Sequence, residues 1–385
     1  MLQALAATPT TDPIPADSLS IARDLLIQLE SRRVRFCHWK SNESLRSALA
    51  GQGDLDLLVD ARDAASFQSV LFDLSFKEAA QDAWLRQRSI RHYYGLDSET
   101  GRMLHVHVYF QLVTGGVLLK NYRLPFEPQL IEQGEIALGV PIPPRSVELL
   151  VFVLRKMLEA GDPVELLLQR MDREHVQREL DWLLDAGDAT VEQAHEWLKL
   201  WLPQIRAELF RQAVEALQSE ASVWRQFLLG RRFRRALRPL ALRGPVSVGL
   251  NSVYRLARRL LARVVRRTGK QLSTGGRVIA LVGPEASGKS TTAVELGRWL
   301  RSAFRVQTVH VGKPRSSCLS YLPNVLRRII KRSARHDGSS NHRSTRRRNS
   351  WAYACASVLL ARDRARACRV AFRDAGRGQV IICDR

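Results

Sequence analysis

The sequence has few cysteines, no long apolar run and, in two segments, almost no acidic side chains. Its five cysteines form no C-x-x-C pair, and an odd number argues against a disulfide framework. No apolar run approaches the roughly 18 residues that span a bilayer. The first residues also lack the basic region and apolar core of a secretory signal. These absences favour a reducing compartment, and we expect a cytoplasmic protein.

The scarcity of acidic residues is local. Residues 224–276 contain 14 Lys and Arg and no Asp or Glu, and residues 313–350 contain 11 against a single Asp. The formal net charge of +22 is concentrated there, and the rest of the chain is close to neutral. Such segments attract anionic partners, so a membrane surface or a nucleic acid is a candidate partner. The basic helix predicted over 251–267 could equally dock its apolar side on a neighbouring domain.

The segment from Val278 to Thr291 has the pattern of a phosphate-binding loop. A short apolar strand precedes G-x-x-x-x-G-K-S and a predicted helix follows, which is the context that the motif requires. Glycines let backbone N–H groups face phosphate oxygens, and the helix N-terminus favours anions. Lys289 would contact the β- and γ-phosphates of ATP, and the Ser290 hydroxyl would bind Mg²⁺. The predicted nucleotide site consists of Gly283, Ala286, Ser287, Gly288, Lys289, Ser290 and Thr291.

The chain after this loop predicts a parallel α/β sheet. Residues 331–350 are rich in Arg and Ser and predict a mobile loop. A helix is expected over 351–375, followed by a buried strand, Val380–Cys383. That strand would deliver Asp384 and Arg385 to the carboxyl edge of the sheet, where ligands of open α/β sheets bind.

Residues 275–385 resemble the thymidylate kinase-like branch of the nucleoside monophosphate kinases. The resemblance rests on Glu285 in the loop, on the run from Gly288 to Thr291, on the helix sequence LLARDRARA and on the final VIICDR. It implies a parallel-sheet kinase that uses ATP and Mg²⁺. The roles that it implies are acceptor binding for Glu285, Arg364 and Arg385, organisation of Mg²⁺ for Asp384 and Ser290, and catalysis for Lys289, Asp384 and Arg385.

The sequence departs from that family in three ways. Leu360 stands where the family has an aromatic residue that stacks on the acceptor base, and such stacking is worth ~1–3 kcal/mol. Residues 331–350 are an insertion. The sequence ends at Arg385, before the family's arginine-bearing lid and adenine-binding segment. We therefore expect a fragment of a longer protein, with the identity of the acceptor open.

Acidic and apolar residues alternate in the N-terminal segment Asp54-Leu-Asp56-Leu-Leu-Val. In a strand both carboxylates lie on one face, and such a pair can hold divalent metals for nucleotidyl transfer. Residues 30–130 resemble the nucleotidyltransferase superfamily, in particular members with a G-D-x-D-x-L-V strand. That family supplies a third carboxylate from a later strand, whereas MLHVHVYFQL presents His105 and His107 here. The resemblance implies either metal-dependent transfer through Asp54 and Asp56 or a degenerate domain that only binds.

Between these two ends, residues 146–218 have the apolar spacing of helices, with Trp182, Trp197 and Trp201 expected to pack a helical core. The predicted fold class is α/β. Its predicted parts are a mobile N-terminus (1–18), an α+β nucleotidyltransferase-like domain (19–144), a helical domain (145–223), a basic linker (224–276) and an incomplete parallel-sheet phosphate-loop kinase domain (277–385).

The sequence as a whole predicts an ATP-binding kinase that transfers the γ-phosphoryl group to a nucleotide-like or other small anionic acceptor. Two alternatives remain open. One is a nucleotidyltransferase that acts through Asp54 and Asp56. The other is a non-catalytic, ATP-binding assembly protein that associates peripherally with a membrane through its basic segments.

Overall fold

The structure is a computed structural model that describes residues 13–310 and 344–384, with short internal gaps. The gaps are 83–85, 88, 117–119, 164, 167–170, 172, 186, 220–221, 245–246, 249–250, 252–253, 259–260, 262–268 and 285, and the side chains at 188, 344–353 and 355–356 are also outside the description. The chain divides into two compact units, residues 1–266 and 267–385. The fold is mixed α/β, as the sequence predicts, with one mixed and one parallel sheet.

The sheet of the first unit has the strand order β1-β2-β5-β4-β3. The strands are β1 (Phe36–His38), β2 (Asp54–Val59), β3 (Lys77–Ala80), β4 (Ile90–Leu96) and β5 (Met103–Tyr109). The two central strands β2 and β5 run parallel, and the other neighbouring pairs run antiparallel. Because side chains alternate along a strand, these strands present one face to each of two helical layers.

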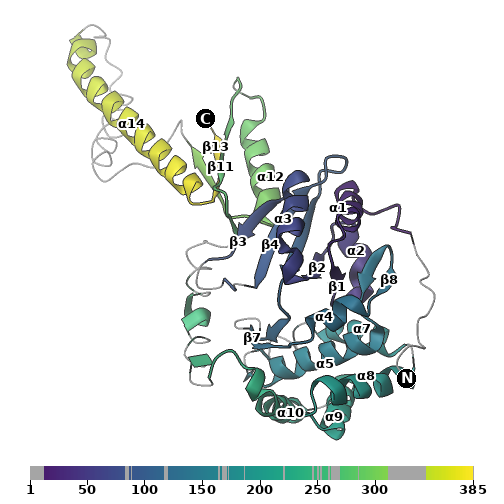
Figure 1. Cartoon of the computed structure of the whole chain (residues 1–385). Coiled ribbons are helices and arrows are strands. Elements are labelled where there is room, and N and C mark those ends of the chain that lie inside the picture. Colours follow the sequence, from purple (N-terminus) through teal and green to yellow (C-terminus); the bar gives the residue numbers. More distant parts are fainter. Residues whose placement is uncertain are drawn as a thin grey trace. The chain divides into compact units, whose positions relative to one another are not determined.

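One face of this sheet packs on α1 (Ser20–Ser31), α2 (Leu45–Leu49) and α3 (Ala64–Asp73). Leu57 of β2 and Val106 of β5 are fully buried in that core with Leu25 and Phe67. Figure 1 shows α1 and α3 beside the strands, with the helices that follow in the chain on the other side. Along β2 and β5, the apolar residues at every second position therefore face α1 to α3. The residues between them face the opposite side of the sheet.

The second layer is a group of helices: α5 (Arg145–Ala160), α7 (Arg173–Leu184), α8 (Asp188–Trp201), α9 (Ala207–Gln218) and α10 (Val223–Ala236). Helix α5 is buried almost all round, and Ser146, Glu148 and Lys156 are buried with its apolar residues. Its core also contains Tyr109 of the sheet. The three tryptophans of this region pack against the same core, which confirms their prediction: Trp182, Trp197 and Trp201.

Helix α10 lies in the segment predicted as a basic linker. It is a packed helix because Leu229, Gly230 and Phe233 form a buried stripe against α5, while most of its arginines are exposed together with Trp224 and Leu228. Gly230 lies so close to α5 that a Cβ there would lie 2.3 Å from the backbone nitrogen of Gly161. Shorter elements complete the unit: α4 (Glu127–Glu132) and the hairpins β6 (Val113–Gly115) with β7 (Lys120–Arg123) and β8 (Glu135–Ala137) with β9 (Val140–Ile142).

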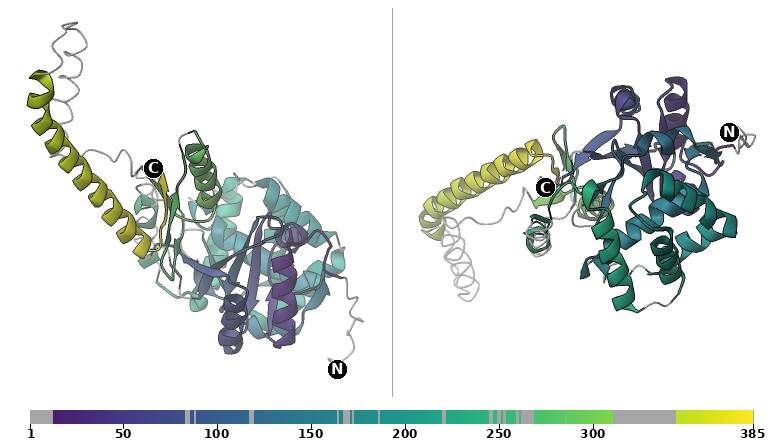
Figure 2. Two further views of the ribbon diagram at one scale, coloured as in Figure 1. Left: turned by 90° about the horizontal axis from the view of Figure 1, so that it is seen from above. Right: turned by 60° about the horizontal axis from the view of Figure 1, so that its bottom comes forward.

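The second unit contains a parallel sheet with the strand order β11-β13-β12. Its elements are β10 (Gln271–Leu272), β11 (Arg277–Leu281), α12 (Lys289–Arg301), β12 (Val306–His310), α14 (Ser344–Gly376) and β13 (Val380–Asp384). The predicted final strand and the helix before it are confirmed. Ala371 and Ala375 of α14 pack on Ile381 of β13, and Figure 2 shows the rest of this long helix extending from the sheet.

The prediction of a loop over 331–350 is wrong in its last seven residues, because α14 already begins at Ser344. The arginines at 346–348 favour a helix, and a helix that is already formed extends into them at little cost. Residues 331–343 lie outside the described residues, as do most of the basic helix predicted over 251–267 and the first twelve residues. Within the described parts of the chain, no helix combines the length and the apolar character needed to cross a membrane.

Asp97, in the turn between β4 and β5, ties that turn to the start of α1. It is fully buried. One carboxylate oxygen accepts from the Ser20 hydroxyl and from the Ile21 N–H at 3.1 Å, and the other accepts from the Thr100 N–H at 3.0 Å. Burial alone would raise the pKa of Asp97, but these hydrogen bonds lower it to about 2.

The variant Asp97→Asn tests this contact. An unfolded Asp has a pKa of about 3.9, so ionised Asp97 stabilises the fold above that pH, and the contribution is lost as the pH falls from about 4 to 2. We expect the variant to be less stable near neutral pH by ~1–3 kcal/mol and to lose part of the wild-type acid dependence. Urea unfolding over this pH range measures both. Asp24→Asn, on the exposed side of α1, is the control, and an acid dependence identical to wild type in Asp97→Asn would contradict the assignment.

Candidate functional site

The predicted phosphate loop joins β11 to α12 at the carboxyl edge of the parallel sheet. Gly288 is the residue before the first turn of α12 and has φ 77°, in the left-handed region. A side chain there would cost roughly 1–2 kcal/mol, so this position calls for glycine. The loop residues Gly283, Ser287 and Gly288 are exposed to solvent. The exposed N-terminus of α12 therefore offers N–H groups and a helix dipole to an anion.

Lys289 lies across this loop. Its ammonium donates to the Pro284 carbonyl and to the Ser287 hydroxyl at 3.2 Å, and that hydroxyl donates to the same carbonyl at 2.9 Å. These partners are exposed and neutral. A phosphate that entered the loop would replace them with charge-assisted hydrogen bonds, which are shorter and stronger.

Asp384 ends β13 beside the loop. The Ser290 hydroxyl donates to its Oδ2 at 3.0 Å, and His310 Nδ1 lies 3.3 Å from the same oxygen. Asp384 is only 4% exposed, and its Oδ1 has no hydrogen-bond partner among the described groups. A hydroxyl and a buried carboxylate oxygen without a partner are the donors that a hard cation such as Mg²⁺ takes. These residues therefore fit the predicted Mg²⁺ site.

The sequence placed Ser290 and Asp384 in one site, and the structure brings them together. Reasoning from the sequence missed His310, although this residue ends β12 in register with Asp384. The rule that sites gather at the carboxyl edge of a parallel sheet would have indicated it. Glu285 and Arg385 lie outside the described residues.

Arg364 lies on an exposed stretch of α14 and Thr291 on the exposed first turn of α12. Seven residues separate Arg364 from the packed Ala371, which is about 10 Å at 1.5 Å per residue. Arg364 thus lies on α14 about two turns before the residues that pack on the sheet.

The predicted carboxylates Asp54 and Asp56 of β2 lie on one face of the first sheet. Their cross-strand neighbours on β5 are His105 and His107. His105 Nδ1 lies 2.5 Å from Asp54 Oδ1, and His107 Nδ1 lies 2.9 Å from Asp56 Oδ1. Asp54 is half exposed and Asp56 is buried. His105 and His107, which stand on the strand where the family has a third carboxylate, are thus the direct partners of the two aspartates.

Three further side chains of this cluster were not predicted. Lys40 Nζ lies 2.9 Å from Asp56 Oδ1. His92 of β4 stacks on His107 with ring centroids 4.4 Å apart, and Lys120 of β7 donates to the Tyr109 hydroxyl at 2.5 Å. Lys40 lies two residues after β1, and that position could have indicated it. Lys120 and His92 come from strands whose pairing the sequence does not reveal.

The electrostatics of this cluster are dominated by burial and by Lys40. Burial alone would raise the pKa of Asp56, but the Lys40 ammonium and His107 hold it well below its usual range. Burial and Lys40 lower the pKa of His107 to about 4, although Asp56 opposes them. Burial and Lys40 lower the pKa of Lys120 to about 7. At neutral pH, Asp56 is therefore ionised and paired with Lys40, and a metal ion would have to displace that ammonium.

The comparisons with known proteins give little beyond this geometry. No family model matches the chain, and no curated protein matches it. Among solved structures, the chain is similar to that titled "Crystal structure of JHP933 from Helicobacter pylori", at 12% identity over 61% of this chain and 95% of the other. The TM-score is 0.21, and a likeness at this level carries no argument about fold or function.

Because Lys40 and Asp56 form a largely buried ion pair, we predict that their contributions to the free energy of unfolding are strongly coupled. Removing one partner of a buried pair costs ~3–5 kcal/mol, because the other charge stays buried. We therefore expect Lys40→Met and Asp56→Asn each to destabilise the fold, and the double variant to lose much less than the sum of the two. Urea unfolding of the four proteins measures the coupling.

The exposed pair Arg46–Asp17, at 3.1 Å, provides the matched control cycle. Its side chains are 67% and 52% exposed, so Arg46→Met and Asp17→Asn should couple by less than about 1 kcal/mol. Additive losses at Lys40 and Asp56 would show that the two charges do not depend on each other.

Proposed function

We propose that this chain binds ATP at the phosphate loop and acts as a phosphotransferase, passing the γ-phosphoryl group to a small anionic acceptor. The observation that carries the proposal is the hydrogen bond from Ser290 to the buried Asp384, at 3.0 Å. It joins the motif that would grip phosphates to the strand end that would hold a cation. A glycine-rich strand-to-helix turn with no ligand would not require a buried carboxylate beside its serine.

The roles of the residues follow from their chemistry. Backbone N–H groups between Gly283 and Ser290 would bind the phosphates, with Lys289 leaving the Pro284 carbonyl for the β- and γ-oxygens. Ser290 and Asp384 would hold Mg²⁺, which neutralises charge on the β- and γ-phosphates when it is bound. His310, next to Asp384, would fix the orientation of that carboxylate.

The acceptor class rests on the resemblance to thymidylate kinase-like proteins. It assigns Glu285, Arg364 and Arg385 to the acceptor, and the two arginines could pair with the phosphate of a nucleotide. Leu360 replaces the stacking aromatic of that family, so a pyrimidine base would gain less from this chain. A nucleotide-like or other small phosphorylated acceptor is the class we propose.

Nucleotidyl transfer at Asp54 and Asp56 stays a second prediction. Two carboxylates on one strand face favour it, but Lys40 and the two histidines already pair with both. The two functions differ in their products. Phosphoryl transfer releases ADP, whereas nucleotidyl transfer releases pyrophosphate and would depend on Asp56.

The variant Lys289→Ala tests the proposal through ATP binding alone. We expect it to weaken binding of ATP with Mg²⁺ by about 10–100-fold, since hydrogen bonds to charged groups contribute about 1.5–3 kcal/mol. Displacement of a fluorescent ATP analogue measures this. ADP release with nucleoside monophosphates as acceptors should fall in parallel.

Arg298→Ala is the matched control. Arg298 lies on the same helix, is 70% exposed and pairs with Glu295, so its loss should leave ATP binding intact. Unchanged binding in Lys289→Ala would remove the phosphate loop as the nucleotide site. Pyrophosphate release that Asp56→Asn abolishes would assign the chemistry to the first unit instead.

A further inference from the structure

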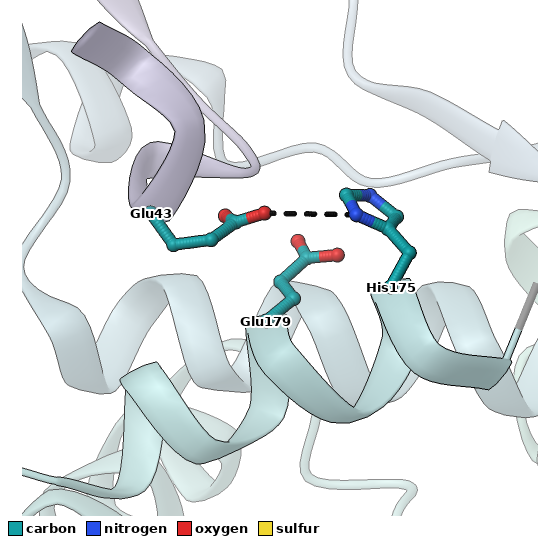
Figure 3. A group of neighbouring side chains, drawn as sticks. All are labelled: Glu43, His175 and Glu179. Atoms are coloured by element: carbon teal, nitrogen blue, oxygen red, sulfur yellow. Dashed lines mark ion pairs between the residues drawn. The ribbon is translucent and has the colours of Figure 1, made fainter. Parts of the chain in front are cut away.

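A group of side chains in the first unit has the composition of a metal site and plays no part in the proposed phosphoryl transfer. Glu43 belongs to η1 (Asn42–Ser44), the short 3₁₀ turn that follows β1, and His175 and Glu179 belong to α7. Each can offer one ligand atom, and these atoms lie within 4.8 Å of one another. Figure 3 shows the Glu43 and His175 side chains directed toward each other, with the Glu179 carboxylate between them.

The geometry of α7 explains how two of these residues converge. Positions four apart lie on the same face of a helix, one turn from each other. His175 and Glu179 therefore present an imidazole and a carboxylate side by side. The turn after β1 brings the Glu43 carboxylate over them from another part of the chain.

The polar atoms of this group are not satisfied by the described protein. Both carboxylate oxygens of Glu43 and Oε2 of Glu179 are buried without a hydrogen-bond partner. His175 Nδ1 is 4.0 Å from Glu43 Oε1, which is too long for a hydrogen bond. The Glu179 side chain has no exposed surface. Leaving such oxygens unpaired is costly, so the group calls for a ligand that bonds to several of them at once.

The contacts of Glu179 also leave room for a further cation beside this group. Glu179 Oε1 accepts from the Ser41 hydroxyl at 3.2 Å and from Arg155 at 3.4 Å. Arg155 is thus the cation that contacts this carboxylate, while burial and the nearby Glu179 raise the pKa of the Glu43 carboxyl group beside it. A divalent cation bound between the two carboxyl groups would favour their ionised forms and contact the oxygens that Arg155 does not.

We propose that Glu43, His175 and Glu179 form a binding site for a divalent first-row transition metal ion such as Zn²⁺ or Mn²⁺. An imidazole nitrogen with two carboxylates suits such ions, whereas Mg²⁺ and Ca²⁺ prefer oxygen ligands alone. Bound about 2.0–2.2 Å from each donor, the ion would draw the three side chains slightly together. His175 is 38% exposed, so this side of the site is open to solvent and to a water ligand.

The site would act as a cross-link between two layers of the first unit. It joins the turn that begins with Lys40 and Ser41 to α7, and Glu179 is also held by Arg155 of α5. A ligand that binds the folded state alone stabilises it. Metal binding should therefore stabilise the turn that positions Lys40 against Asp56.

Titration of the whole chain with Zn²⁺ or Mn²⁺, after treatment with a chelator and without ATP, tests the proposal. We expect one high-affinity ion per chain and a rise in Tm. His175→Ala and Glu43→Gln should each weaken binding at least about tenfold, since even outer partners of metal ligands are worth about 10–100-fold. Both residues are partly exposed, so these variants should fold, which their circular dichroism without metal will verify.

Two control variants make the assignment specific. Glu174→Gln, an exposed position on the same helix, should bind the metal as wild type does. His105→Gln should do so as well, although it alters the histidine cluster on β4 and β5. Loss of binding in His105→Gln with retention in His175→Ala would place the ion in that cluster and overturn the proposal, as would a wild-type chain that takes up no ion.

Discussion

The burial of α5 is the constraint on which the first unit depends. This helix is buried on nearly every side, and it carries the buried Glu148 and the largely buried Arg155. Buried charges and polar groups must find partners. Glu148 accepts from the backbone and the side chain of Asn42, at 3.1 and 2.8 Å, and Arg155 pairs with Glu179. The turn after β1 and helix α7 are thus both attached to α5 through polar side chains that are wholly or largely buried.

That attachment positions the polar face of the sheet. The turn held by Glu148 contains Asn42, and two residues earlier it carries Lys40, the partner of Asp56. Ser41 between them has φ 57°, a left-handed conformation that a serine adopts only with surrounding support. The hydrogen bond from Ser41 to Glu179 supplies such support. The environment of Asp56 therefore depends on contacts made several elements away in the chain.

The sequence predicts those parts of the sites that are local, and fails where partners come from distant segments. The phosphate loop is contiguous, so its residue order alone defines a strand, a tight turn and a helix. Ser290 and Asp384 are 94 positions apart, but both follow from one rule about strand ends. The pairing of Lys40 with Asp56 follows no such rule, because it depends on how the turn after β1 is anchored. Nothing in the alternation of acidic and apolar residues in β2 indicates that the charge of Asp56 is already balanced.

The two aspartates predicted to bind metal therefore differ in kind. Asp56 faces an ammonium and an imidazole, so a cation there would have to replace these contacts and leave the largely buried Lys40 without its partner. Asp384 faces a hydroxyl and the exposed His310, and its Oδ1 has no partner in the described part of the chain. The cost of displacing a buried ammonium is several kcal/mol, whereas a free carboxylate oxygen loses nothing when it meets a cation. On electrostatic grounds, the strand end beside the phosphate loop is the better place for Mg²⁺, and the first sheet is better suited to holding its charges in fixed positions.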